Sequence, residues 1–154
     1  MEEQHYRVFR LRVRYSETDQ MGVVYHTNYL NWFEWGRTEF IREAGLSYKQ
    51  LEDAGILLPV TDAQISFKAP ARYDELIEVR TWVEDLTELR LTFGYEICRV
   101  EDGELLVTGQ TRLVAVNAEW KPARMSKLSP DIYGWLKQEY LKTKAYKESL
   151  TDAK

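Results

Sequence analysis

The sequence has little cysteine, little histidine and no excess of positive charge. Its single cysteine, Cys98, cannot form an intramolecular disulfide, and we expect a reduced thiol inside a strand. Two widely separated histidines and one cysteine cannot supply the ligand spacing of a zinc site, so no metal is predicted. The net charge of −4 argues against a nucleic-acid-binding protein, whose usual mark is a basic surface.

Long apolar runs and nucleotide-binding motifs are also missing. The N-terminus has no apolar signal core and no apolar run is long enough to cross a bilayer, so we expect a cytoplasmic protein without membrane insertion. The sequence contains no phosphate loop, dinucleotide fingerprint or G-x-S-x-G elbow. With no repeat or linker, residues 1–154 are predicted to form a single domain.

One long helix follows the first strand. Apolar residues alternate with arginines over residues 9–15, as in a half-buried strand. From about Thr27 the apolar period becomes helical for about 18 residues, and Gly45 is well placed to end that helix. Glu34 is expected to pair with Arg37 at i, i+3. The residues expected on the packed side are Tyr29, Leu30, Phe33, Gly36, Arg37, Phe40, Ile41 and Ala44.

Two shorter helical segments have clear start signals. Ser47 and Gln50 have capping-box spacing and open a helix that ends near Gly55. Ser129 and Pro130 have the N-cap and N1 positions of a C-terminal helix that starts at about residue 129. We expect a mobile tail after about residue 146.

The remaining stretches predict a sheet. Alternation over residues 63–69, 77–83, 89–97 and 105–115 is typical of strands, and Asp102-Gly103 is a hairpin turn. Because no β-α-β alternation follows the first helix, the sheet is predicted to be mostly antiparallel. The predicted fold class is α+β, with an antiparallel sheet of about five strands wrapped around the long helix.

Residues 15–29, between the first strand and the long helix, concentrate the chemistry. A helix N-terminus has unpaired N–H groups and the positive end of the dipole, so it can hold an oxyanion. Asp19 lies a few residues upstream and can act as base or nucleophile towards an electrophile held there. The alternative to this catalytic role is a purely structural one, in which Asp19 forms an Asx-turn ahead of Gly22. The loop predicts a small acyl-transfer hydrolase.

A set of residues at fixed spacing runs from this loop through most of residues 8–126. The set comprises Tyr15-x-x-Thr18-Asp19-x-x-Gly22-x-Val24-Tyr25-His26-x-x-Tyr29, Phe33-Glu34, Arg37-Thr38-Glu39, Phe67-x-x-Pro70-Ala71-x-Tyr73-x-x-Leu76 and Thr92-Phe93-x-Tyr95-Glu96-Ile97. Together these residues resemble the hotdog-fold acyl-CoA thioesterases of the 4-hydroxybenzoyl-CoA thioesterase family. The similarity is greatest to the bacterial branch encoded with the Tol–Pal system.

The resemblance implies a fold, an activity and an assembly. It implies a hotdog fold, thioester hydrolysis of an acyl-CoA or an acyl-carrier-protein substrate, and homodimers or homotetramers with active sites at subunit interfaces. Asp19 matches the family's catalytic carboxylate, and the backbone N–H of His26 matches the group that polarises the thioester carbonyl. No cofactor is implied, because coenzyme A is part of the substrate.

Other candidate residues surround this pair. The His26 imidazole either assists catalysis or only packs, while the backbone N–H of His26 polarises the carbonyl. Gly22 either allows the backbone to approach the thioester closely or is only a turn glycine. Val24, Tyr25 and Tyr29 are expected to contact the substrate, the tyrosines by shaping the acyl pocket, since an ordinary phenol is a poor acid at neutral pH.

The phosphates of coenzyme A require a basic rim. The candidates are Arg90 on the third of these strands and Lys121, Arg124 and Lys127 after the last one, with the 121–127 group favoured because its loop could fold over the nucleotide. Related enzymes often have a serine-rich run where residues 86–90 lie, so the nucleotide contacts are the part of the resemblance that differs.

Two functions of other kinds stay open. A hotdog hydratase or dehydratase acts on acyl thioesters, but the spacing of Asp19, Gly22 and His26 favours a thioesterase. A non-catalytic module that binds acyl-CoA or acyl-carrier protein is disfavoured by the intact Asp19. The aromatic residues near the motif suit an aryl or a medium acyl chain equally.

Overall fold

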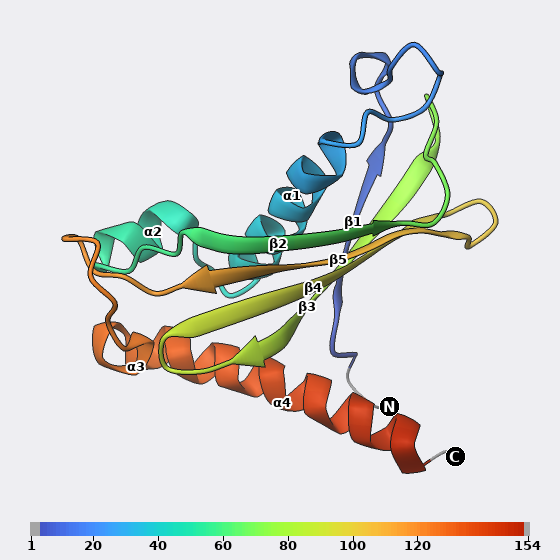
Figure 1. Cartoon of the computed structure of the whole chain (residues 1–154). Helices are drawn as coiled ribbons and strands as arrows, with labels where there is room; N and C mark the ends of the chain where they lie inside the picture. Colours follow the sequence, from blue (N-terminus) through green and yellow to red (C-terminus); the bar gives the residue numbers. More distant parts are fainter. Residues whose placement is uncertain (1–3, 153–154) are drawn as a thin grey trace.

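The computed structural model of the chain describes residues 4–152 and has one five-stranded sheet with helices packed against it (Figure 1). The elements in chain order are β1 (Arg7–Arg12), the 3₁₀ turn η1 (Tyr15–Glu17), α1 (Asn28–Arg42), α2 (Tyr48–Asp53), β2 (Val60–Phe67), β3 (Leu76–Leu86), β4 (Arg90–Arg99), β5 (Leu105–Val114), α3 (Met125–Leu128) and α4 (Pro130–Asp152).

The sheet is antiparallel throughout. Its strand order is β1-β3-β4-β5-β2, and each neighbouring pair is antiparallel. The β4–β5 hairpin turns at Gly103, whose φ of 72° favours glycine and whose N–H donates to the Arg99 carbonyl at 2.8 Å. The predicted α+β class and antiparallel sheet of about five strands are confirmed.

Helix α1 packs across the concave side of the sheet. Its buried residues are Tyr29, Trp32, Phe33, Gly36, Phe40 and Ile41. The Phe33 ring stacks on Tyr95 of β4 with ring centroids 4.2 Å apart. At Gly36 the backbone of α1 lies so close to the side chains of β3 that an added Cβ would lie 2.4 Å from Thr81 Oγ1. The helix is therefore fixed to the sheet by aromatic packing and by the absence of a side chain at Gly36.

Three details of the α1 prediction are wrong. The helix has 15 residues and stops at Arg42, with Gly45 beyond it at φ 80°. Leu30 is 40 % exposed while Trp32 is fully buried, because the Trp32 indole donates to a buried carboxylate instead of reaching solvent. The hydrogen bonds and ion pairs of residues 4–152 include none between Glu34 and Arg37, whose guanidinium lies beside tyrosine hydroxyls instead.

Strand β2 is an edge strand that pairs with β5 alone. Its residues are exposed except for the intermediate Ile65 and Ser66, and Phe67 is 52 % exposed. The half-buried alternation expected there does not form, although the Tyr29 ring of α1 contacts Phe67 at the end of the strand. An exposed edge of this kind can pair with another strand.

Helix α4 begins where the Ser129–Pro130 signal predicts. The Ser129 hydroxyl accepts a hydrogen bond from Ile132 N at 3.4 Å, and the helix lies along β3 in Figure 1. Leu136 and Glu139 are buried, and Glu139 pairs with Arg7 at 2.7 Å. The mobile tail expected after about residue 146 is helical as far as Asp152. Within residues 4–152, no helix is both long and apolar enough to cross a bilayer.

We predict that Gly36→Ala lowers the free energy of unfolding by about 1–3 kcal/mol, because the new Cβ overlaps Thr81. Gly134→Ala is the matched control, since no atom lies within 4 Å of its Cβ position in α4, and better helix propensity should add about 1 kcal/mol. Urea unfolding of both variants measures the difference. Equal stability of Gly36→Ala and wild type would contradict the close approach.

A second prediction concerns His5, whose ring stacks on Tyr146 of α4 with centroids 4.1 Å apart. Burial lowers the pKa of His5, although Glu84 acts in the opposite direction and Lys147 adds to the lowering. The unfolded chain then binds the proton first, so stability is lost as the pH falls below about 6.5. His5→Phe should remove that part of the melting-temperature difference between about pH 7.5 and 5.5, and an unchanged difference would exclude His5 as its source.

Candidate active site

The loop before α1 is held in place by the buried carboxylate of Glu17, which is 6 % exposed. This carboxylate accepts hydrogen bonds from the Arg14 backbone N–H and from Trp32 Nε1, both at 2.8 Å. The Glu17 carbonyl accepts from Tyr25 N and from Asn28 Nδ2, both at 2.9 Å. One residue therefore joins β1, the loop and the first turns of α1.

Asp19 is in a tight turn within this loop. Its N–H donates to the Val23 carbonyl at 2.9 Å, and its carbonyl accepts from Gly22 N at 3.0 Å. Gly22 has a φ of 80°, which a side chain would strain. Asp19 Oδ1 accepts from Met21 N at 2.9 Å, so the Asx-turn is present. The other carboxylate oxygen has no protein partner among the described residues, so the turn leaves it available for chemistry.

The N-terminus of α1 provides the second group. Thr27 is the N-cap, and within the described chain neither the His26 N–H nor the Thr27 N–H donates to a protein acceptor. Free amides at the positive end of a helix are suited to an oxyanion. The exposed His26 ring lies between Tyr25 and Phe67, with centroid distances of 4.7 and 6.3 Å.

Asp19 and His26 line one cavity of about 320 Å³. Tyr29 closes it from α1, where its hydroxyl accepts a hydrogen bond from Ala71 N at 3.1 Å. Burial raises the pKa of Tyr29, which keeps the phenol neutral and agrees with a pocket-shaping role. The full lining is Asp19, Met21, Val23, Val24, His26, Tyr29, Phe67, Lys68, Ala69 and Pro70.

Two candidates lie beside this cavity but not on its wall. Gly22 forms the turn next to it, and Tyr25 is 47 % exposed on the outer side of the loop. The wall contributed by residues 67–70 was not assigned from the sequence, although Phe67-x-x-Pro70 belongs to the motif of the resemblance. Antiparallel pairing with β5 brings the end of β2 to this point, and a local pattern cannot reveal that pairing.

The expected basic rim is at the other end of the sheet. Phe67, at the end of β2, pairs with Val107 of β5, which in turn pairs with Ile97 of β4. Arg90 pairs with Val114 and lies seven residues from Ile97 along β4, a separation of about 23 Å. Lys121 and Arg124 follow β5, whose last residue, Val114, pairs with Arg90 at that same far end. Within one chain these three cations do not meet Asp19, and Lys68 is the cation that lines the Asp19 cavity.

Arg99, which lies near the cavity, is already paired with carboxylates, and no metal-binding cluster is found in the described residues. Arg99 approaches the Pro70 carbonyl, but Glu75, Asp102 and Glu104 already pair with it at 2.6–2.9 Å. In residues 4–152 there is no group of three or more His, Cys, Asp or Glu side chains that could hold a metal ion. The candidate chemical groups at this cavity are Asp19, the amides at His26 and the His26 ring.

Proteins of known sequence and structure are similar to this chain. The profile of the Thioesterase-like superfamily matches residues 13–136. YneP of Bacillus subtilis is 43 % identical over 122 residues, which cover 79 % of this chain and 88 % of that protein. The acyl-CoA thioester hydrolase YbgC of Escherichia coli is 31 % identical over 118 residues, covering 76 % and 87 % of the two chains.

Solved structures agree in fold over almost the whole chain. The DHNA-CoA thioesterase of Staphylococcus aureus has a TM-score of 0.82 and 39 % identity, with 94 % of each chain covered. The 1,4-dihydroxy-2-naphthoyl-CoA thioesterase of Synechocystis has a TM-score of 0.76 and 25 % identity, with 83 % and 95 % covered. The predicted family and hotdog fold are confirmed. The chain belongs to the thioesterase-like superfamily and is a hotdog-fold enzyme of the thioester hydrolase type.

Proposed function

We propose that the protein hydrolyses an acyl-CoA thioester to a carboxylic acid and coenzyme A in the cavity between Asp19 and the N-terminus of α1. The observation that carries the proposal is that a carboxylate with one free oxygen and the unpaired amide of His26 border the same cavity. This is the pair of groups that thioester hydrolysis needs. The family membership supports the reaction class, and the geometry supports the assignment of roles.

The chemistry is undemanding for a thioester. Sulfur donates poorly to the carbonyl and a thiolate leaves readily, so one carboxylate and one oxyanion site are sufficient without a cofactor. In one route Asp19 deprotonates water, the hydroxide adds to the carbonyl, and the tetrahedral oxyanion collapses with loss of the thiolate. In the other, Asp19 attacks the carbonyl, the thiolate leaves, and water hydrolyses the mixed anhydride.

We assign the oxyanion role to the His26 N–H and a supporting role to the imidazole. The amide has a fixed position at the first turn of α1, whereas the ring is exposed and makes only aromatic contacts. An exposed imidazole next to the cavity can protonate the departing thiolate, with bulk water as an alternative donor.

We propose an aromatic acyl group. The Tyr29 and Phe67 rings lie on the cavity wall with centroids 5.7 Å apart and ring planes tilted by 55°, which offers aromatic faces and edges to an aryl group. The Staphylococcus aureus and Synechocystis thioesterases are both described with dihydroxynaphthoyl or DHNA thioesters, which are aromatic. Met21, which is 78 % exposed, adds apolar surface at the rim.

We further propose a cytoplasmic homodimer formed through β2. If two β2 edge strands pair antiparallel across a two-fold axis, the start of β2 in one copy lies beside the end of β2 in the other. The partner's far end, with its Arg90, Lys121 and Arg124 positions, would then approach the Asp19 cavity of the first copy. This arrangement reconciles the basic residues expected to bind coenzyme A phosphates with their separation from Asp19 in one chain.

Asp19→Asn should lower kcat for thiol release from aryl-CoA thioesters by about a hundredfold or more, because the amide can neither attack nor accept a proton. Asp53→Asn, on the exposed side of α2, is the control and should keep wild-type turnover. Circular dichroism of each variant confirms folding. Unchanged turnover by a folded Asp19→Asn protein would remove Asp19 from the mechanism.

Tyr29→Phe and Tyr25→Phe test how the cavity wall is held. Tyr29→Phe leaves Ala71 N–H without its acceptor and should reduce the free energy of unfolding by about 1–2 kcal/mol. The Tyr25 hydroxyl makes no hydrogen bond in residues 4–152, so Tyr25→Phe should change stability by less than about 0.5 kcal/mol. Urea unfolding compares the two, and equal losses would argue against the Tyr29–Ala71 bond.

A further inference from the structure

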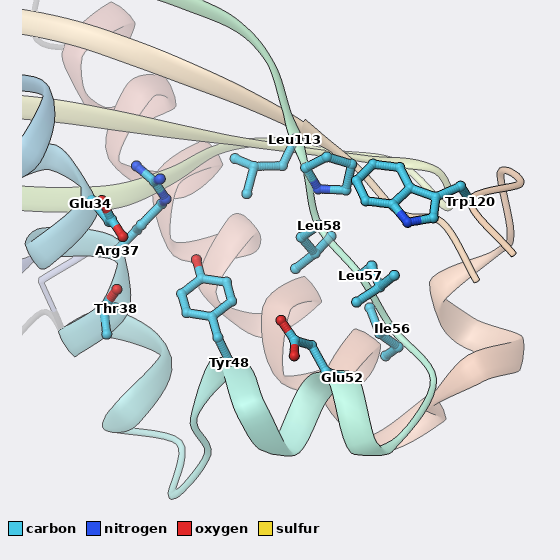
Figure 2. A pocket seen from close by; sticks show the side chains of 11 residues that line it. Glu34, Arg37, Thr38, Tyr48, Glu52, Ile56, Leu57, Leu58, Leu113 and Trp120 are labelled. Carbon is cyan, nitrogen blue, oxygen red and sulfur yellow. The ribbon is translucent and has the colours of Figure 1, made fainter. Parts of the chain in front are cut away.

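A second cavity, of about 320 Å³, lies beside the middle of α1 (Figure 2). It is enclosed by α1, α2, the segment before β2 and the turn after β5. Arg37, on its wall, is eleven residues along the chain from His26, about 16 Å of helix. The two cavities share no lining residue, so this one has no part in the Asp19 chemistry of the same chain.

The polar end of the cavity has a cation without a carboxylate ion-pair partner in the described chain, and the Tyr48 and Tyr95 hydroxyls lie beside it. The half-buried Arg37 guanidinium lies beside the hydroxyls of Tyr48 and Tyr95, and no carboxylate of the described residues forms an ion pair with it. The Tyr95 hydroxyl bonds to Thr111 Oγ1 at 2.6 Å, but buried Tyr48 Oη has no hydrogen-bond partner. Figure 2 shows the Tyr48 hydroxyl directed toward Arg37 at the same end of the cavity.

These two groups favour an anion. A guanidinium remains protonated in proteins, and removing it from water without a counter-ion is costly. Burial raises the pKa of Tyr48 even though Arg37 acts against the rise, so the phenol stays neutral and can donate. Glu34 and Glu52 also line the cavity, and the Glu34 charge acts on Arg37 and Tyr48. Both carboxylates are exposed, however, so solvent screens them, and within residues 4–152 neither forms an ion pair with Arg37. A carboxylate between Arg37 and Tyr48 would satisfy both.

The opposite wall is apolar and includes a strained residue. Ile56, Leu57, Leu58, Pro59, Leu113 and Trp120 form this wall. Trp120 has a φ of 61°, and the Asn117 carbonyl, which accepts from its N–H at 2.9 Å, helps to hold it there. A left-handed conformation costs a bulky residue about 1–2 kcal/mol and persists mainly where the surroundings or function require it. An indole that is 67 % exposed is thereby held over the mouth of the cavity.

We propose that this cavity binds a small organic carboxylate with an apolar body. The carboxylate lies on Arg37 and the Tyr48 hydroxyl, and the body lies against the leucines and Trp120. Such a ligand has two sources: a free acid in solution, or the far end of an acyl group that a second copy presents from its own Asp19 cavity. The second source rests on the proposed function, whereas binding of a free acid does not.

The first experiment measures binding of benzoate and 2-naphthoate, with benzamide and 2-naphthamide as neutral isosteres, by titration calorimetry. Wild type should bind each carboxylate at least about tenfold more tightly than its amide. Arg37→Gln should abolish that preference and Tyr48→Phe should reduce it severalfold. Arg42→Gln is the control, because this exposed arginine pairs with Glu39 on another face of α1. Asp19→Asn should bind the acids like wild type, which separates this site from the catalytic one.

The second experiment distinguishes the two sources through hydrolysis of acyl-CoAs that end in a carboxylate or in its methyl ester. If the cavity receives the acyl end, Arg37→Gln raises KM for the carboxylate substrate alone. If it receives a free acid, that acid changes the wild-type rate and the change is lost in Arg37→Gln. Equal binding of acids and amides by wild type, or a preference that survives in folded Arg37→Gln, would overturn the proposal.

Discussion

The hydrogen bonds of Glu17 are the interaction on which the active site depends. A buried carboxylate is costly unless donors satisfy it, and here the Arg14 N–H and Trp32 Nε1 do so. Since Trp32 is fully buried in α1, the loop cannot move relative to the helix without breaking these bonds. The separation between the Asp19 carboxylate and the amides at His26 is thereby set by a residue that does no chemistry. The close approach at Gly36 then fixes the same helix to the sheet.

Local patterns in the sequence predicted the elements and the chemical groups of the site. The positions of the strands, the Ser47 and Ser129 caps and the turn at Gly103 depend on neighbouring residues, and these predictions are confirmed. Asp19 and His26 share a cavity, as expected. The failures concern contacts across the fold. Trp32 rather than Leu30 is buried because Glu17 lies inside, and Arg37 turns to Tyr48 and Tyr95 on other elements. Residues 67–70 reach the site only through the pairing of β2 with β5.

The two cavities divide the molecule along α1. One lies at the N-terminal end of the helix and is lined by a carboxylate and by residues with free amides, while the other lies beside its middle and is lined by a half-buried cation and an apolar wall. An exposed edge strand, β2, runs from one region to the other. In the proposed dimer the two β2 strands run antiparallel, so the far end of one sheet lies beside the Asp19 cavity of the other copy. Each thioester site then gains basic residues from the other copy, whereas the same residues of its own chain lie far from Asp19.

The central claim is that the cavity between Asp19 and His26 turns over thioesters, and the most direct measurement is product analysis with the wild-type protein. An aryl-CoA is incubated with enzyme, and free thiol and carboxylic acid are quantified together over many turnovers. The account predicts catalytic release of thiol and acid in a one-to-one ratio. Tight binding of the thioester with no thiol release from any aryl or alkyl substrate would contradict it.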